Sequence, residues 1–272
     1  CYRCWYNKEY PGCDLACARE LERAIQKAGA ENISAFIAEP IGGSAIGSVP
    51  APKGYFEIIR EICDKYDVLF IADEVQTGFG RTGKNFGIEH WNACPDMIIC
   101  AKGMSSGYAP IGAVITTEEI QSTFAQEGFR HGFTFGGIPI SCAIGYAVLE
   151  YMTKHDLLAQ AAVRGKQLMK QLSTLREHPS VGDIRGKGLL TGIEFVQNKE
   201  TKEPFQPALN FSYRLQEILL RNGLSVYPIH AFLDGERGDH IQVAPPFIVT
   251  PSQINEIVAI LDQSLNQIES SL

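Results

Sequence analysis

Short apolar runs alternate with helix-like segments through the first half of the chain. Strand-length runs occupy residues 33–38, 68–72, 97–101 and 112–115, and residues 53–66 place apolar side chains on one helical face. A strand, a helix and a second strand in this order form the unit from which parallel sheets are built. The pattern therefore predicts an α/β fold, with a largely parallel sheet and helices on both of its faces.

Two further helices are expected in this half. Residues 14–28 carry apolar side chains at helical spacing, with Asp14 as the expected N-terminal cap and Gly29 as the stop. Residues 140–152 follow a glycine-rich loop and have a helical pattern as well. Between the strand runs, residues 76–96 are expected to be a polar connection.

The second half of the chain has a different pattern. A long helix is expected at 156–177, ended by Pro179 after His178. The later elements are expected to be strands near 189–196, 224–227 and 241–243 and helices at 207–221 and from 251 onward. Such an order suits a smaller, antiparallel α+β domain. The sequence therefore predicts two domains, residues 1–155 and residues 156–272.

Polar side chains stand where two of the predicted strands end. Asp73 follows the run at 68–72, and Lys102 follows the run at 97–101. Because the carboxyl ends of parallel strands lie along one edge of a sheet, the carboxylate and the amine are expected to face one cleft. A lysine that forms an imine, with an aspartate that keeps a pyridinium nitrogen protonated, is what pyridoxal phosphate requires. A solvated lysine and a turn-capping aspartate are the simpler interpretation of the same residues.

Three separated stretches favour the cofactor: IADEVQTGFGRTG, AKGMSSGYAPIGAV and GFTFGGIPISCA. In residues and in order they resemble the class III, or omega, aminotransferases, which are pyridoxal phosphate enzymes of fold type I. The resemblance implies a transaminase that moves an amino group from an amino acid, an omega-amino acid or an amine to pyruvate or 2-oxoglutarate. It makes residues 1–155 part of the large cofactor-binding domain.

The resemblance covers nearly all of this chain but only the later part of the family. Relatives begin further upstream, and that upstream part carries a phosphate-binding loop and an aromatic residue that stacks on the cofactor ring. The chain is therefore expected to be a fragment, and to bind the cofactor poorly on its own.

The resemblance also implies roles for individual residues. Lys102 would carry the cofactor and shuttle a proton, and Asp73 would keep the ring nitrogen protonated. Val75 would offer an apolar face to the ring, and Gln76 would hydrogen-bond the ring hydroxyl. Glu39, in an EP motif at the end of the first strand run, would help to organise the site.

Thr134 lies in the glycine-rich loop before the helix expected at 140–152. Read alone, it is a turn residue. In the family that this chain resembles, the threonine of the motif reaches the cofactor phosphate of the other subunit. The resemblance therefore implies a homodimer with shared active sites.

A substrate carboxylate would need a cationic partner, and the planar guanidinium of arginine suits it. Two candidates occur in the second half: Arg185, in IRGKGLLTGIEF, and Arg237, in DGERGDHIQVAPPF. Both could be solvated loop residues. Arg237 is near the place where omega-amine transaminases carry a mobile arginine, so it is the preferred candidate.

Charge and hydropathy exclude several other partners. A net charge of -7 at pH 7 argues against nucleic acid as the partner. No apolar run approaches the roughly 20 residues that cross a bilayer, and no basic-then-apolar leader is present. A cytoplasmic enzyme acting on a small-molecule amino donor and a keto acid is expected, with no membrane partner.

Two motifs indicate other chemistry. Cys1, Cys4, Cys13 and Cys17 have a spacing found in zinc and iron–sulfur sites, but the last two open an amphipathic segment, so no metal site is predicted. Residues 78–85, GFGRTGKN, nearly match a phosphate-binding loop but lack its final Ser or Thr.

Three alternatives to a transaminase stay open. An aminomutase or a decarboxylase of the same fold would keep both Lys102 and Asp73. A catalytically silent module whose cysteines hold zinc is the alternative from another class of protein.

Overall fold

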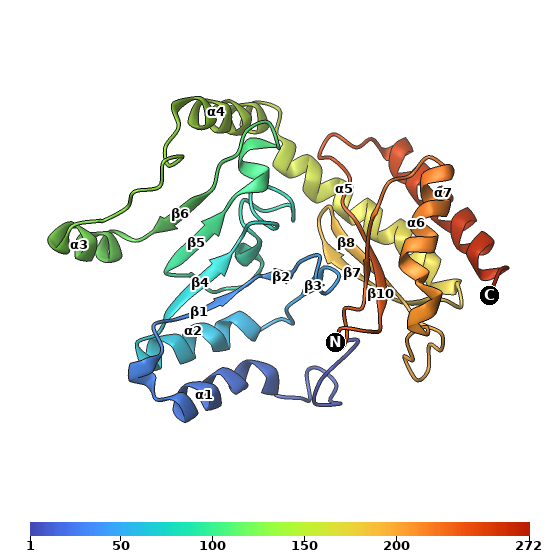
Figure 1. The fold of residues 1–272 in the computed structure, drawn as a ribbon, viewed down its shortest axis with the longest axis horizontal. Helices are drawn as coiled ribbons and strands as arrows, with labels where there is room; N and C mark the ends of the chain where they lie inside the picture. The colour runs from blue at the N-terminus through green and yellow to red at the C-terminus, as the bar shows by residue number, and fades with distance from the viewer. The chain divides into compact units, whose positions relative to one another are not determined.

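The computed structural model describes the backbone of residues 1–272 and all side chains except those of residues 126 and 127. The chain folds into two compact units (Figure 1). Unit 1 consists of Cys1–Pro40, Ala51–Gly80 and Lys84–Asp156, and unit 2 of Ile41–Pro50, Arg81–Gly83 and Leu157–Leu272. The sequence predicts a single boundary near residue 155. In the structure, two short segments from the first half, Ile41–Pro50 and Arg81–Gly83, also belong to unit 2.

Unit 1 is built on a four-stranded sheet with the order β1-β4-β5-β6. Its strands are β1 (Ala35–Ala38), β4 (Leu69–Asp73), β5 (Met97–Cys100) and β6 (Ala113–Thr116). The first three run parallel, with Ala38 paired to Ala72 and Asp73 paired to Ile99, whereas β6 is antiparallel to β5. The prediction of an α/β fold with a largely parallel sheet is confirmed.

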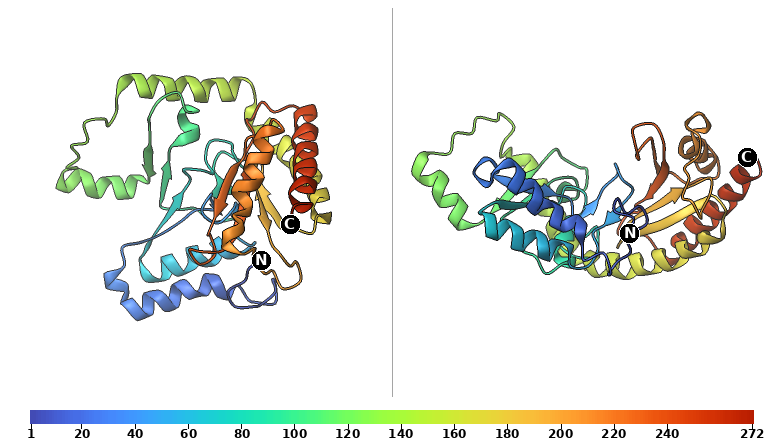
Figure 2. Two further views of the ribbon diagram at one scale, coloured as in Figure 1. Left: turned by 45° about the vertical axis from the view of Figure 1, so that its right-hand side comes forward. Right: turned by 90° about the horizontal axis from the view of Figure 1, so that it is seen from below.

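The helices of unit 1 include one that joins two parallel strands. They are α1 (Ala16–Ala28), α2 (Tyr55–Tyr66), α3 (Glu118–Glu127) and α4 (Pro139–Lys154), with short 3-10 turns at η1 (Ala30–Asn32), η2 (Gly87–His90) and η3 (Lys102–Ser105). Figure 2 shows α1 and α2 side by side, with α2 nearer the sheet. Phe56 of α2 stacks on Phe70 of β4 with 5.7 Å between ring centroids, and both rings are fully buried. Apolar burial of this kind fixes α2 on the sheet.

Unit 2 contains a second, antiparallel sheet with the order β7-β8-β10-β9. Its strands are β7 (Val181–Lys187), β8 (Leu190–Phe195), β9 (Tyr227–His230) and β10 (Asp239–Val243), and β2 (Ile41–Gly42) pairs with β3 (Val49–Pro50) in a separate hairpin. Its helices are α5 (Leu157–Leu172), α6 (Phe211–Arg221) and α7 (Pro251–Glu269), with 3-10 turns at η4 (Ser173–Glu177) and η5 (Pro207–Leu209). This is the expected α+β arrangement.

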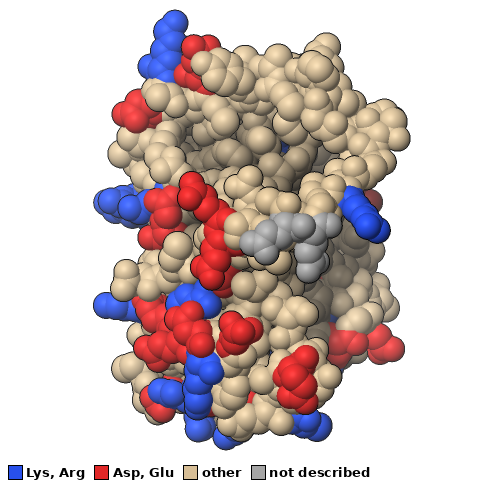
Figure 3. All heavy atoms as spheres, turned by 90° about the vertical axis from the view of Figure 1, so that its left-hand side faces the viewer, with Lys and Arg blue, Asp and Glu red and all other residues tan. Residues whose placement is uncertain are grey.

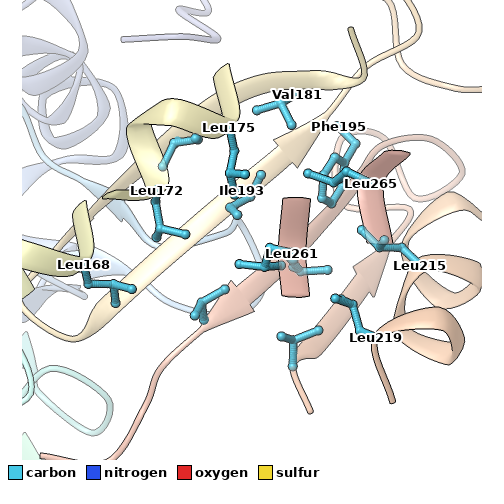
Figure 4. Packing of buried hydrophobic residues seen from close by; sticks show 14 of the residues in the cluster. Leu168, Leu172, Leu175, Val181, Ile193, Phe195, Leu215, Leu219, Leu261 and Leu265 are labelled. Atoms are coloured by element: carbon cyan, nitrogen blue, oxygen red, sulfur yellow. The ribbon is translucent and has the colours of Figure 1, made fainter. Parts of the chain in front are cut away.

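The core of unit 2 lies between its helices and one face of its sheet (Figure 4). Each element contributes buried apolar side chains: Leu168 and Leu172 from α5, Ile193 and Phe195 from β8, Leu215 and Leu219 from α6, and Leu261 and Leu265 from α7. Burial of one such side chain stabilises a fold by about 1.5–3 kcal/mol. The helices of unit 2 are therefore held by packing rather than by helix propensity.

The segment 41–50 packs closely against the sheet of unit 2. A Cβ atom added at Gly192 of β8 would lie 2.2 Å from the carbonyl oxygen of Gly47, which itself has a φ of +78°. Only glycine permits this approach of two backbones without a shift of one of them. The segment is therefore part of the fold of unit 2.

Two boundary predictions were wrong. Asp14 does not cap α1: both Asp14 and Leu15 have left-handed backbones, the helix begins at Ala16, and the Asp14 carboxylate pairs with Arg19 instead. The strand expected at 224–227 begins only at Tyr227, because the amide of Leu224 still bonds the carbonyl of Leu219 at the end of α6. In both places a positive φ, at Asp14 and at Gly223, decides where the element starts.

Several elements have no counterpart in the predictions. α3 was not predicted, although Thr117 caps it by accepting a bond from the amide of Ile120. The hairpin of β2 and β3 was not predicted either, since its strands have only two residues each. Among the described residues, no helix is both long and apolar enough to cross a membrane.

Candidate active site

Three polar residues follow the three parallel strands of unit 1. Glu39 comes directly after β1, Asp73 is the last residue of β4, and Lys102 lies two residues beyond β5. The strands are neighbours in the order β1-β4-β5, and Asp73 is paired with Ile99. The three residues therefore lie along one edge of the sheet, where ligands of open α/β sheets bind.

The turns after β4 and β5 contact each other. A Cβ atom added at Gly103, next to Lys102, would lie 3.4 Å from the Cβ of Phe79 and 3.6 Å from the carbonyl oxygen of Gly78. Lys102 itself is solvent-exposed, has a φ of +40°, and begins η3, against which α4 packs. The lysine thus lies beside the turn that Asp73 opens.

Hydrogen bonds within the turn after Asp73 fix its conformation. One carboxylate oxygen of Asp73 accepts a hydrogen bond of 3.1 Å from the amide of Val75, and the amide of Gly78 bonds the carbonyl of Glu74 at 2.9 Å. The side-chain Oε1 of Gln76 is buried, yet it has no hydrogen-bond partner among the described residues. A buried acceptor without a partner is costly and is typical of a site that a ligand completes.

Glu74 is a site residue that the sequence analysis missed. Its carboxylate is fully buried and accepts hydrogen bonds of 2.7 Å from the amides of Gly87 and Ile88, and a very short one from the hydroxyl of Thr77. Burial raises the pKa of the Glu74 carboxyl, although these bonds favour its charged form. Glu74 therefore fixes the turn that carries Asp73. A glutamate directly after a strand, with a threonine three residues on, is the signal that could have identified it.

Thr134 lies in an exposed turn before α4. Its neighbours Phe133 and Phe135 are 62% and 68% exposed, and their rings form part of a chain of aromatic contacts. Figure 3 shows the side of the molecule that is on the left in Figure 1. On this face, charged side chains gather over the lower and left parts, and uncharged side chains cover most of the upper part.

Arg185, one of the two candidate substrate arginines, is occupied within unit 2. Its guanidinium donates to the carbonyl oxygens of Gly47 and Ile46 at 2.8 Å and 2.9 Å, and it pairs with the buried carboxylate of Glu194 and with Asp183. Its side chain is only 10% exposed. These contacts bind the segment 41–50 to β7 and β8.

Two further residues hold the same segment. The Nε2 atom of His240 lies 2.9 Å from the carbonyl oxygen of Ser44, and the amide of Gln242 donates to the hydroxyl of Ser48 at 3.0 Å. Burial lowers the pKa of His240 to about 4. The imidazole is therefore neutral at pH 7 and donates through Nε2–H.

Arg237, the other candidate, lies in the exposed loop between β9 and β10. Its guanidinium contacts Asp234 at 2.8 Å and Glu203 at 3.7 Å, and it is half exposed. The pKa of Asp234 is lowered to about 2, first by the hydrogen bond from the Arg237 side chain. Because exposed ion pairs contribute little free energy, Arg237 is free to exchange this carboxylate for another.

The phosphate-loop motif has a structural role. The Arg81 guanidinium donates to the carbonyl oxygens of Leu189 and Pro245 and lies 4.6 Å from the centroid of the Phe247 ring. Burial lowers the pKa of Arg81 to about 10. Arg81 thereby secures the segment 81–83 within unit 2.

None of the eight cysteines is in a disulfide. In the part of the chain whose side chains are described, no group of three or more His, Cys, Asp or Glu residues is arranged to hold a metal ion.

Comparison with known proteins gives one family. Residues 3–265 match the family model of the class III aminotransferases. An uncharacterised aminotransferase of Bacillus subtilis, YodT, is 38% identical over 94% of this chain, and putrescine–pyruvate aminotransferase of Pseudomonas aeruginosa is 38% identical over 92% of it. The chain covers 58% and 53% of these two relatives, so it spans little more than half of their length.

Solved structures of transaminases have the same fold as this chain. A transaminase obtained by ancestral reconstruction superposes on the whole chain with a TM-score of 0.91 at 36% identity, and the chain covers 59% of it. An (S)-enantioselective omega-transaminase from Thermomicrobium roseum superposes on 98% of the chain with a TM-score of 0.90 at 35% identity, and 58% of that protein is covered. The fold is that of the pyridoxal phosphate enzymes of fold type I, and the chain belongs to the class III aminotransferase family.

Proposed function

We propose that this chain serves a pyridoxal phosphate-dependent transamination, with Lys102 and Asp73 as the catalytic residues. The observation that carries the proposal is their position at the ends of the adjacent parallel strands β5 and β4, with the following turns in contact. Family membership supports the same assignment.

The residues along this edge fit the cofactor. The buried, unpartnered Oε1 of Gln76 suits the ring hydroxyl, and the second carboxylate oxygen of Asp73 suits a protonated ring nitrogen. When bound, the cofactor supplies a ring that withdraws electrons from the reacting carbon of the substrate. Val75 would pack on the ring, and Glu39 would flank it from the end of β1.

Lys102 would act twice through its Nζ atom. As a nucleophile, the free amine would hold the cofactor covalently between turnovers. Once the amino donor has displaced it, the amine would accept a proton from one carbon and return it to another. Both roles need an uncharged amine at one defined place, and the contact between η3 and the turn 74–79 would provide the place.

The working enzyme would be a homodimer. Large apolar side chains are exposed in the loop before α4 and on α4 itself, among them Phe129, Phe133, Phe135, Ile140 and Tyr146. A surface of this kind is typical of a protein interface. A second copy of the chain would cover it and would bring Thr134 to the cofactor phosphate of its partner.

The substrates would be an amino acid, an omega-amino acid or an amine as donor and pyruvate or 2-oxoglutarate as acceptor. Similarity to putrescine–pyruvate aminotransferase and to gamma-aminobutyrate transaminases of tomato supports a donor with a terminal amino group. Arg237, whose present partners are exposed, would bind the substrate carboxylate. To bind the substrate carboxylate, Arg185 would have to break its contacts with four residues. We therefore assign Arg185 to holding the segment 41–50 in position. The enzyme would be cytoplasmic, a location in which free thiols persist.

The test is product analysis with a matched variant. Because the chain is expected to bind the cofactor poorly on its own, donor and keto acid are mixed with the protein and a large excess of the cofactor, and the new amino acid and new keto acid are measured. We expect equal amounts of both, loss of turnover in Lys102→Ala, and unchanged turnover in Lys84→Ala, an exposed lysine of the same unit. Release of carbon dioxide, or an isomer of the donor as the only product, would instead indicate a decarboxylase or an aminomutase.

A further inference from the structure

Helix α6 ends in a hydrogen-bonded turn. The amide of Leu224 donates to the carbonyl oxygen of Leu219 at 2.8 Å. The amide of Gly223 donates to that of Leu220 at 3.1 Å. Two bonds with this spacing form a Schellman cap, which needs a left-handed backbone at Gly223. Gly223 has a φ of +92°, and a Cβ atom added to it would meet none of the described atoms within 4 Å. The backbone conformation, rather than a lack of space, therefore makes glycine the favoured residue.

Asn222, the C-terminal cap residue of α6, comes directly before this glycine. It is the only asparagine in the sequence that a glycine follows. The backbone nitrogen after an asparagine can attack the carbonyl carbon of its side chain, and glycine has no side chain to obstruct the attack. Asn222 is partly exposed and Gly223 is exposed, so water can reach both. The glycine that the cap needs thus makes Asn222 the most labile asparagine of the chain.

Two hydrogen bonds in the folded chain oppose this attack. The Nδ2 atom of Asn222 donates to the hydroxyl of Ser264 on α7 at 2.9 Å, and Ser264 is fully buried. This bond holds the side-chain amide that would otherwise be attacked. The N–H group of Gly223, which would have to lose its proton, is bonded to Leu220. Asn222 is therefore protected while the end of α6 stays closed against α7.

We propose that Asn222 is a site of spontaneous deamidation and that its hydrogen bond to Ser264 controls the rate. When the end of α6 opens, the Gly223 amide loses its proton to hydroxide, and its nitrogen bonds to Cγ of Asn222. The bond from Cγ to Nδ2 breaks, and the nitrogen takes a proton from water and leaves as ammonia. Water then opens the cyclic imide at either carbonyl carbon, which gives aspartate or isoaspartate. The net reaction consumes one water and releases one ammonia.

Either product weakens the end of α6. A carboxylate at position 222 cannot donate to Ser264, and it places a negative charge at the helix C-terminus, where the helix dipole disfavours it. Isoaspartate also adds a carbon to the backbone before Gly223, so the two bonds of the Schellman cap cannot keep their spacing. Deamidation therefore makes a local opening of α6 permanent.

Peptide mapping measures the reaction directly. The folded protein is kept at mildly alkaline pH, and samples are digested with trypsin, which cuts after Arg221 and Arg237. Asn222 is the only asparagine or glutamine in the peptide 222–237, so a new carboxylate found there by mass spectrometry comes from Asn222. A sample digested at time zero corrects for reaction during digestion. We expect the peptide to deamidate several-fold more slowly in the folded protein than in urea.

Variants separate the hydrogen bond from overall stability. Ser264→Ala is expected to speed deamidation of the folded protein several-fold, whereas Ser270→Ala, at an exposed serine just after α7, is expected to leave the rate unchanged. Leu261→Ala lowers the stability of unit 2 by removing a buried side chain, but it keeps the bond between Asn222 and Ser264. It is expected to react more slowly than Ser264→Ala. In urea, all of these proteins should react at the same rate.

Three results would each overturn the proposal. Equal rates in the folded and the unfolded protein would show that the fold does not protect Asn222. An unchanged rate in folded Ser264→Ala would show that the hydrogen bond does not control the reaction. A rate in Leu261→Ala as high as that in Ser264→Ala would show that unfolding of the whole unit, rather than release of this bond, exposes Asn222.

Discussion

Replacement of Glu74 by glutamine tests whether this buried carboxylate holds the turn that carries Asp73. The variant keeps the shape of the side chain but turns one acceptor oxygen into a donor. That donor would face either the Thr77 hydroxyl and the Gly87 amide, or the amide of Ile88. A buried donor that is left without an acceptor costs about 1–3 kcal/mol, so the free energy of unfolding is expected to fall by about that amount.

The assay is urea unfolding followed by tryptophan fluorescence. Both tryptophans lie in unit 1, and Trp91, next to η2, is buried against Phe56. The signal therefore reports on the unit that contains Glu74. Glu61→Gln, at an exposed site on α2, is the control and is expected to change stability by less than about 0.5 kcal/mol. A loss of under about 1 kcal/mol in Glu74→Gln would refute the proposed role of the carboxylate.

The free energy of unfolding should also depend on pH through Glu74. Because the pKa of Glu74 is raised in the folded state, the folded state binds its proton more tightly than the unfolded state does. The stability from this proton is fully present below the unfolded pKa of 4.5 and is lost as the pH rises through the folded pKa. Glu74→Gln should lack this loss when both proteins are unfolded across the weakly acidic range.

Three further predictions concern unit 2. Gly192→Ala should lower the free energy of unfolding by about 2 kcal/mol or more, because its Cβ would overlap the carbonyl oxygen of Gly47; an unchanged midpoint in urea would contradict the close approach. The pKa of His240 is lowered from 6.5 to about 4, so its stabilising effect should be lost as the pH falls through this range, by roughly 3 kcal/mol at pH 4. The protection factors of the amides of residues 41–50 against hydrogen exchange should fall over this range, and should fall less in His240→Gln. Arg237→Ala should raise KM for carboxylate-bearing substrates about tenfold or more and leave KM for simple amines nearly unchanged; equal effects on both would exclude the carboxylate role.

The strand-end residues were predictable because local pattern determines them. An apolar run followed by one polar residue marks both the strand and its end, so the pattern alone places Asp73 and Lys102 at one edge of the sheet. Helix α7 was predictable for a similar reason, since Pro251 and the Thr250 cap signal its start.

The features that were missed depend on contacts between distant residues. Nothing local in the segment 41–50 indicates that Arg185 and His240, well over a hundred residues later, will bind it to unit 2. The three partners of Glu74 include two backbone amides more than ten residues away, which no spacing rule identifies. Arg81 likewise sits in a motif that resembles a phosphate loop, whereas its partners are carbonyl groups from the second half of the chain.

Locating the lysine that the cofactor modifies would show whether Lys102 carries it. The protein is incubated with pyridoxal phosphate, reduced with borohydride and digested, and the modified lysine is located by mass spectrometry, with Lys102→Ala and Lys84→Ala treated in parallel. We expect reduced cofactor on the peptide that contains Lys102, the same result in Lys84→Ala, and no specific label in Lys102→Ala. Label spread over exposed lysines, or an equal yield in Lys102→Ala, would contradict it.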